Sequence, residues 1–301
     1  MKIINHNIKD YLAVLVAFST AFVLSTFISG SMPSYSGVSI LVICMLASFF
    51  LHWITFIPSF IFRTEKFYDI LGTLAYLTVL SIASFLTYSN SDGYLSRRSL
   101  IVVSLVLIWA LRLGIFLFIR VLKAGEDRRF RDAKQSFSKF LLWWTVSALW
   151  VFFTTLNALT IIINNYEPIS DIFFIIGIII WLIGFSFELI SDEQKRRFKL
   201  NPSNRNKFIS TGLWSVSRHP NYFGEIVIWI GIAVISIPTL HGLQYFTLVS
   251  PIFVILLLTR VSGVNLLEKQ SDDKWGDLED YKRYIKKTPS LIPFTKNLNG
   301  K

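Results

Sequence analysis

Long uncharged apolar blocks recur along the chain, and each is about as long as a helix that crosses a bilayer. A transmembrane helix needs roughly 20 apolar residues, and 53% of the 301 residues are hydrophobic while only 16% are charged. These blocks predict an all-α fold, a polytopic membrane helix bundle with about eight transmembrane helices and a cytoplasmic C-terminal tail. The expected spans are Tyr11–Ser29, Val38–Phe62, Tyr68–Tyr88, Leu100–Val121, Phe140–Ile163, Ile172–Ile190, Tyr222–Leu240 and Leu243–Val264.

Lysine and arginine residues concentrate in alternate segments between these blocks. They lie before the first block, near Arg63, in 120–139, in 195–218 and from Arg260 onward. Cytoplasmic loops carry the excess of positive charge in membrane proteins, so we expect both termini in the cytoplasm of a multi-pass protein of a bacterial inner membrane. The net charge of +11 then reflects orientation. No nucleic-acid-binding motif accompanies it, and no nucleic-acid partner is expected.

Several other functional classes are disfavoured by the motifs that the chain lacks. Cys44 is the single cysteine, so an intramolecular disulfide is impossible. The histidines have no metal-ligand spacing, and neither a G-x-G-x-x-G motif nor a P-loop occurs. We therefore expect no metal site and no soluble nucleotide-binding fold.

Residues 218–225 combine a basic helix start with a carboxylate at a predicted membrane boundary. Arg218 and His219 precede Pro220, whose fixed φ suits the first turn of a helix. The free backbone N–H groups of a helix start attract anions such as phosphate. Glu225 begins an otherwise uncharged stretch, where a carboxylate is unfavourable unless it has a function. The pattern predicts an anion site beside a functional acid.

Further polar residues interrupt three of the other apolar blocks. Glu188 and Asp192 lie four residues apart and share one face of a helix, and Lys199 follows them. Arg112 lies in the middle of a block and needs an anionic partner, either a carboxylate or a cofactor phosphate. Asp69 lies at the start of its apolar block. It is either a carboxylate that caps the helix start or a catalytic group.

The segment after the last block is polar but rich in aromatic residues, among them Trp275, Tyr281 and Tyr284. One interpretation is a basic helix that lies on anionic lipid. The other is a lid that folds over the bundle and closes a bound cofactor against the helix start at Pro220.

Three groups of residues carry a resemblance to a known family. They are Gly212 to Trp214, Asn221 to Ile226 with Trp229 and Gly231, and the tail from Tyr281 to Phe294. In this order they resemble the C-terminal domain of the steroid 5α-reductase family, and more closely an uncharacterised bacterial branch of it. The resemblance covers about 69–294 and leaves the spans in 1–66 outside, within a single membrane domain of residues 1–301. Residues 218–222 also look like sterol Δ14-reductases and isoprenylcysteine methyltransferases.

The resemblance implies a cytoplasm-facing cavity for NADPH. It places Asp192, Lys199 and Asn221 at the dinucleotide, Glu225 by the nicotinamide and Arg112 by the phosphates. This chain has Glu188 where the family has Asn, and Lys199 where the family has Arg. A lysine cannot make the bidentate phosphate contact that an arginine makes. Trp109 stands about where the steroid reductases carry a substrate-polarising Tyr. Steroid specificity is therefore not expected.

The leading hypothesis is a membrane-embedded, NADPH-dependent reductase of a C=C bond in a lipid or steroid-like substrate. The alternatives are a lipid or isoprenylcysteine-type methyltransferase that uses S-adenosylmethionine, and a non-catalytic lipid-binding scaffold. The methyltransferases carry an acidic pair before the tail, where this chain reads Glu268 and Lys269. The candidate catalytic residues are Asp69, Tyr222 and Glu225, and the candidate cofactor contacts are Arg112, Glu188, Asp192, Lys199, Arg218, His219, Asn221, Glu268 and Tyr281.

Overall fold

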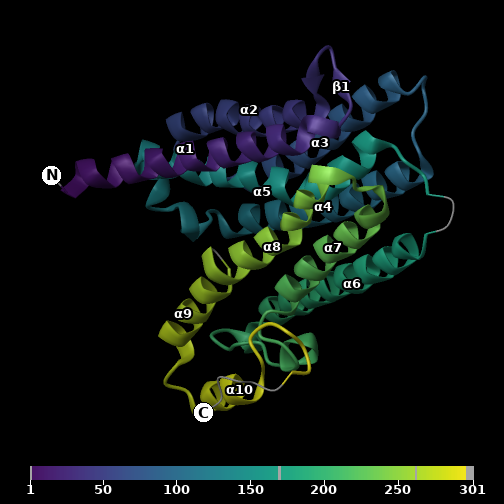
Figure 1. The fold of residues 1–301 in the computed structure, drawn as a ribbon. Coiled ribbons are helices and arrows are strands. Elements are labelled where there is room, and N and C mark those ends of the chain that lie inside the picture. The colour runs from purple at the N-terminus through teal and green to yellow at the C-terminus, as the bar shows by residue number, and fades with distance from the viewer. Residues whose placement is uncertain (1, 169–170, 262, 296–301) are drawn as a thin grey trace. The chain divides into compact units, whose positions relative to one another are not determined.

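The computed structural model describes residues 2–168, 171–261 and 263–295, and its long elements are all helices (Figure 1). Among these residues, eight segments are helices long and apolar enough to cross a membrane, which confirms the predicted fold class of a multi-pass integral membrane protein. The helices are α1 (Lys2–Ile28), α2 (Ile40–Ile61), α3 (Tyr68–Asn90), α4 (Arg97–Ala124), α5 (Phe137–Asn164), α6 (Ile172–Leu200), α7 (Pro220–Ser236), α8 (Val249–Leu256), α9 (Val264–Trp275) and α10 (Glu279–Lys287).

The chain divides into two compact units. The first unit comprises Met1–Asp171 with Ser236–Ser250, and the second comprises Ile172–Ile235 with Pro251–Lys301. The first unit contains α1 to α5 and a short antiparallel hairpin of β1 (Ser34–Tyr35) and β2 (Val38–Ser39). The second unit contains α6 to α10, apart from the first residues of α8.

Helix α5 is the centre of the first unit. Helices α1, α2, α3 and α4 all pack against it, and Trp144, Phe152 and Leu156 are fully buried along its length. Its polar side chains have partners inside the unit, as polar groups in an apolar interior need. The Tyr76 hydroxyl lies 2.7 Å from that of Thr154, and the Asn157 amide donates to hydroxyls of the returning 236–250 segment.

Helices α6 and α7 of the second unit run side by side with their backbones in contact (Figure 1). A Cβ atom on Gly184 would lie 2.6 Å from the amide nitrogen of Ile228, and one on Gly224 would lie 2.6 Å from the amide nitrogen of Glu188. Two turns further along, the same contact is made by Gly177 and Gly231. Close backbone approach through small residues is a typical packing mode of transmembrane helices.

The segment that follows α7 is less regular than the sequence predicts. The Ile237–Thr239 turn is a 3₁₀ helix, and another 3₁₀ helix, Gly242–Leu248, leads into α8. A π-helical turn, Leu257–Val261, then separates α8 from α9. A Cβ on Gly263 would lie 2.0 Å from the carbonyl oxygen of Leu258, so only glycine fits after this turn. The expected span Leu243–Val264 is thus built from several short helical pieces.

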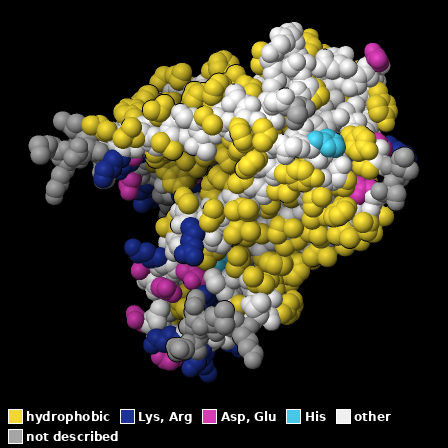
Figure 2. All heavy atoms as spheres, viewed as in Figure 1, with side chains coloured by type: hydrophobic (Ala, Val, Ile, Leu, Met, Phe, Trp, Pro, Cys, Tyr) yellow, Lys and Arg dark blue, Asp and Glu magenta, His cyan; other side chains and the backbone are white. Residues whose placement is uncertain are grey.

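Charged and apolar side chains occupy different parts of the second unit. In Figure 2 hydrophobic side chains cover the region of α6 and α7, whereas Lys, Arg, Asp and Glu gather around α9 and α10. Exposed isoleucine and leucine side chains on α6, such as Ile175, Ile179 and Leu182, would face lipid. The polar end contains the residues that the sequence analysis singled out.

We predict that Gly224→Ala lowers the stability of the protein, because the added methyl group must push α6 and α7 apart. The expected loss is about 1–3 kcal/mol, as for other overpacked interiors, and it would be measured as a lower Tm in detergent. The matched control is Gly72→Ala in α3, where an added Cβ meets nothing within 4 Å. An equal Tm for the two variants would contradict the backbone contact.

Candidate functional site

Helix α7 begins at Pro220, as the sequence predicts. The loop before it is paired with the C-terminal tail of the same unit. The amide of Arg218 donates to the carbonyl of Pro289 at 2.9 Å, and the hydroxyl of Ser217 donates to the carbonyl of Leu291 at 2.7 Å. The tail therefore lies against the start of α7, as the lid interpretation requires.

Glu268 of α9 is a shared acceptor for three groups around this helix start. Its Oε1 lies 2.9 Å from Arg218 Nη2 and 3.3 Å from His219 Nε2. The hydroxyl of Ser290 donates to the same oxygen at 2.8 Å. The side chains of Arg218 and His219 are buried, and that of Glu268 is about one-third exposed. The predicted cationic helix start is thus already neutralised by a carboxylate.

A second acidic group lies where α6 meets α7. Asp192 Oδ1 accepts a hydrogen bond from Asn221 Nδ2 at 3.3 Å. Glu188 and Glu225 lie on the same two helices, and all three carboxylates are buried. The glycine contact explains this arrangement, because Gly224 touches the backbone of Glu188 directly. We call Asp192, Arg218, His219, Asn221 and Glu268 the helix-entrance cluster.

His219 is the titratable base of this cluster. Burial lowers the pKa of its imidazole below the usual 6.5, and the hydrogen bond to Glu268 opposes this shift. The imidazole is therefore neutral at pH 7. A neutral ring that donates from Nε2 to Glu268 leaves Nδ1 as an acceptor. The ring also stacks on Tyr222, with centroids 5.8 Å apart and planes 12° from parallel.

Lys199 and Tyr281, two predicted cofactor contacts, are placed differently from the cluster residues. Lys199 is exposed in the last turn of α6. Tyr281 is buried against Phe208, and its hydroxyl donates to Asp272 Oδ1 at 3.1 Å. Burial and the nearby Asp272 carboxylate raise the pKa of Tyr281 to about 12. A packing role explains Tyr281, and cofactor binding by either residue stays a prediction.

Asp69 and Arg112 belong to the first unit. Asp69 lies in the first turn of α3, which Phe67 rather than Asp69 caps, and its carboxylate is 3.9 Å from Arg129 Nη2. The guanidinium of Arg112 lies 5.5 Å from the centre of the Phe116 ring. Trp109 is buried edge-on to Tyr76. The roles predicted for Asp69 and Arg112 stay predictions.

Glu65, in the loop before α3, has a structural role in this unit. It is buried and accepts from the amide of Asp127 at 2.9 Å and from Lys134 Nζ at 2.8 Å. These bonds hold the loop after α4, whose Phe130 packs into an aromatic cluster with Tyr68 and Trp143.

Sequence reasoning missed Ser290 and the contact of Lys195 with Trp214. Ser290 is one hydroxyl in a polar tail and has no local signature. Lys195 places its ammonium 4.5 Å from the centre of the Trp214 ring, while the Trp214 indole donates to the carbonyl of Ser191 at 3.0 Å. A cation–π contact of this kind fixes the loop against α6, and the spacing of the two residues could not indicate it.

We predict that Tyr284→Phe loosens the tail. The Tyr284 hydroxyl donates to the carbonyl of Trp214 at 2.7 Å, and a hydrogen bond of this type contributes about 1 kcal/mol. Amide hydrogen exchange in residues 288–294 should accelerate roughly fivefold. Tyr245→Phe, at an exposed position in the first unit, is the control. Unchanged exchange in both variants would show that this bond does not hold the tail.

Comparison with known proteins gives one curated relative and one family. A protein of Ustilaginoidea virens named Probable O-methyltransferase ustE is 29% identical over 103 residues, which cover 31% of this chain and 36% of that protein. The chain thus spans little more than a third of the length of this relative. No solved structure matches. The family model described as Protein of unknown function (DUF1295) matches residues 55–288, which is most of the chain, and the chain belongs to this family.

Proposed function

We propose that this protein is a membrane methyltransferase that uses S-adenosylmethionine to methylate an oxygen atom of a lipid. The observation that carries the proposal is the charge of the helix-entrance cluster and its surroundings. Glu188, Asp192 and Glu225 are buried there, and the Glu268 carboxylate pairs with Arg218 and accepts from His219. The name of the Ustilaginoidea virens relative supports the same reaction class.

The two candidate cofactors differ in charge. S-adenosylmethionine carries a sulfonium and an ammonium group, so its net charge is positive, whereas NADPH carries several phosphate charges. Anionic phosphates need cations and backbone donors that have no other partner. Asp192, Glu188 and Glu225 suit a cationic ligand instead, because a buried carboxylate stabilises a nearby positive charge. The donor set therefore fits S-adenosylmethionine better than NADPH.

Each residue of the site has its own role in this proposal. Glu188, Asp192 and Glu225 would hold the positive groups of the cofactor. The Nε atom of Arg218, which has no hydrogen-bond partner among the described residues, would donate to its carboxylate. S-adenosylmethionine supplies an electrophilic methyl group, whose C–S bond breaks as the new C–O bond forms and the neutral thioether leaves. The acceptor hydroxyl loses its proton as that bond forms. His219 is positioned to take this proton, because its imidazole is neutral and buried.

An acceptor dissolved in the bilayer fits the fold. The eight apolar spans form an integral membrane protein, and the α6 surface that leads to the carboxylates is covered with exposed aliphatic side chains. A lipid with a hydroxyl or carboxyl head group can reach a polar site at the membrane boundary without leaving the bilayer.

A second candidate function is the NADPH-dependent reductase. One observation favours it. The Nε atom of Arg218 is buried and has no hydrogen-bond partner among the described residues, and the start of α7 lies directly after this residue. A phosphate could accept hydrogen bonds from Arg218 Nε and from the backbone N–H groups at the start of α7. The same protein preparation can distinguish the two functions.

We predict that purified protein binds S-adenosylmethionine, and that Asp192→Asn and Glu225→Gln each weaken this binding roughly tenfold, because each removes a buried negative charge. Isothermal titration with S-adenosylmethionine and with NADPH in parallel would measure it. Asp273→Asn, at an exposed position of α9, is the control. Binding of NADPH alone would replace this proposal with the reductase, and binding of lipid but neither cofactor would favour the non-catalytic scaffold.

We also predict the pH dependence of methyl transfer to a lipid extract, followed with a labelled methyl group. A base whose pKa lies below 6.5 keeps its activity at pH 6.5 and loses it only in more acidic solution. Glu268 favours the imidazolium form, so Glu268→Gln should move the acidic limb to still lower pH. His219→Ala should lower the rate roughly 10²–10⁴-fold. An acidic limb above pH 6.5, or one unchanged in Glu268→Gln, would exclude His219 as the base.

A further inference from the structure

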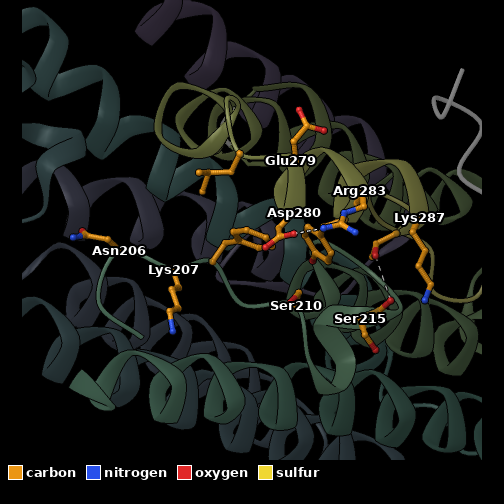
Figure 3. Close-up of a pocket in the computed structure, with 12 residues that line it drawn as sticks. Asn206, Lys207, Ser210, Ser215, Glu279, Asp280, Arg283 and Lys287 are labelled. Atoms are coloured by element: carbon orange, nitrogen blue, oxygen red, sulfur yellow. Dashed lines mark hydrogen bonds and ion pairs between the residues drawn. The ribbon is translucent and has the colours of Figure 1, made fainter. Parts of the chain in front are cut away.

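A pocket of about 690 Å³ lies in the second unit, between the segment after α6 and helix α10 (Figure 3). Asn206 to Ser210 form one side of it, and residues 278–288 form the other. Phe208 and Tyr284 provide aromatic surface, with their ring centres 5.4 Å apart. None of the residues of the helix-entrance cluster lines this pocket.

The acidic residues of the lining are neutralised within α10. Asp280 forms an ion pair with Arg283, and Glu279 forms one with Lys282 at 2.7 Å. The other two charged residues of the lining are Lys207 and Lys287. Neither lysine side chain has a hydrogen bond or an ion pair with any described residue. The pocket thus presents two ammonium groups without a protein counter-charge.

Some of the other polar groups of the lining already form hydrogen bonds within the protein, and others do not. The Tyr284 hydroxyl donates to the carbonyl of Trp214, and the Thr288 hydroxyl donates to that of Ser215. The Ser210 hydroxyl has no such partner among the described residues. Figure 3 shows Lys207 and Lys287 at opposite ends of the lining, with Ser210 between them and both ammonium groups directed to the same side.

We propose that this pocket binds a phosphate compound that lies between Lys207 and Lys287, with its organic part on Phe208 and Tyr284. Two lysines supply point charges of the kind that bind phosphate, and a serine hydroxyl adds a donor. The volume accommodates a phosphate with an attached group the size of a small metabolite or a lipid head group. The assignment does not rest on methyl transfer, and it survives if the proposed function fails.

The position of the pocket allows two sources of this phosphate. The segment after α6 and helix α10 lie in the regions whose positive charge predicts a cytoplasmic location. A phospholipid head group at that surface and a soluble phosphate compound present the same chemistry. The test must therefore include a phospholipid and a soluble phosphate compound.

The direct test is the rate at which lysines of the full-length protein are acetylated, followed by mass spectrometry. The protein would be placed in phosphatidylcholine vesicles, in vesicles that also contain phosphatidic acid, and in the former with inorganic pyrophosphate. Lys207 and Lys287 should be protected by phosphatidic acid if the source is lipid, and by pyrophosphate if it is soluble. Lys66 and Lys123, two exposed lysines of the first unit, report any general surface effect. Equal labelling of all four lysines with every probe would overturn the proposal.

Variants provide an independent measurement. The protecting probe should raise the Tm of the natural protein and of the control variant Lys66→Gln/Lys123→Gln by the same amount. The rise should be absent in Lys207→Gln/Lys287→Gln, whose basal Tm is expected to be unchanged because both side chains are exposed and unpaired. A full Tm rise in Lys207→Gln/Lys287→Gln would show that the phosphate binds elsewhere.

Discussion

The backbone contact between α6 and α7 is the constraint on which the arrangement of the second unit depends. Gly177 and Gly184 on one helix meet Gly231 and Gly224 on the other, and at each point a methyl group would overlap with backbone atoms. In a lipid environment helices gain no hydrophobic energy from pairing, so close packing must hold them together. This packing brings carboxylates of both helices to one polar end, where Asp192 can reach Asn221.

Electrostatics at that end decide which ligands the protein can accept. A helix start flanked by arginine and histidine predicts an anion site, and the resemblance to the steroid 5α-reductase family implies NADPH as the anion. Glu268 changes the balance, because its carboxylate pairs with the Arg218 cation and accepts a hydrogen bond from the neutral His219 ring. The same carboxylate keeps the buried Arg218 compensated, which an apolar boundary requires. One residue from another helix thus supplies a counter-charge that the local motif does not contain.

The sequence predicts features that depend on neighbouring residues, and it does not predict contacts between residues that lie far apart along the chain. The spans and the start of α7 at Pro220 were predicted correctly, because apolar length and proline geometry are local properties. The pairing of His219 with Glu268, 49 residues away, was not, since no local pattern encodes it. The bonds from Glu65 to Asp127 and Lys134 were not readable either, since these partners lie 62 and 69 residues further along the chain. The site assignments themselves remain predictions.

The pairing of the α7 start with the C-terminal tail bears on how the protein is made. The loop at Ser217 finds its partner 74 residues later, in Leu291, after every span has been synthesised. During translation the spans can enter the membrane while this loop still has only water for its polar groups. The helix-entrance cluster is therefore completed only once Glu268 of α9 has been synthesised, and the tail segment that pairs with the start of α7 follows later still.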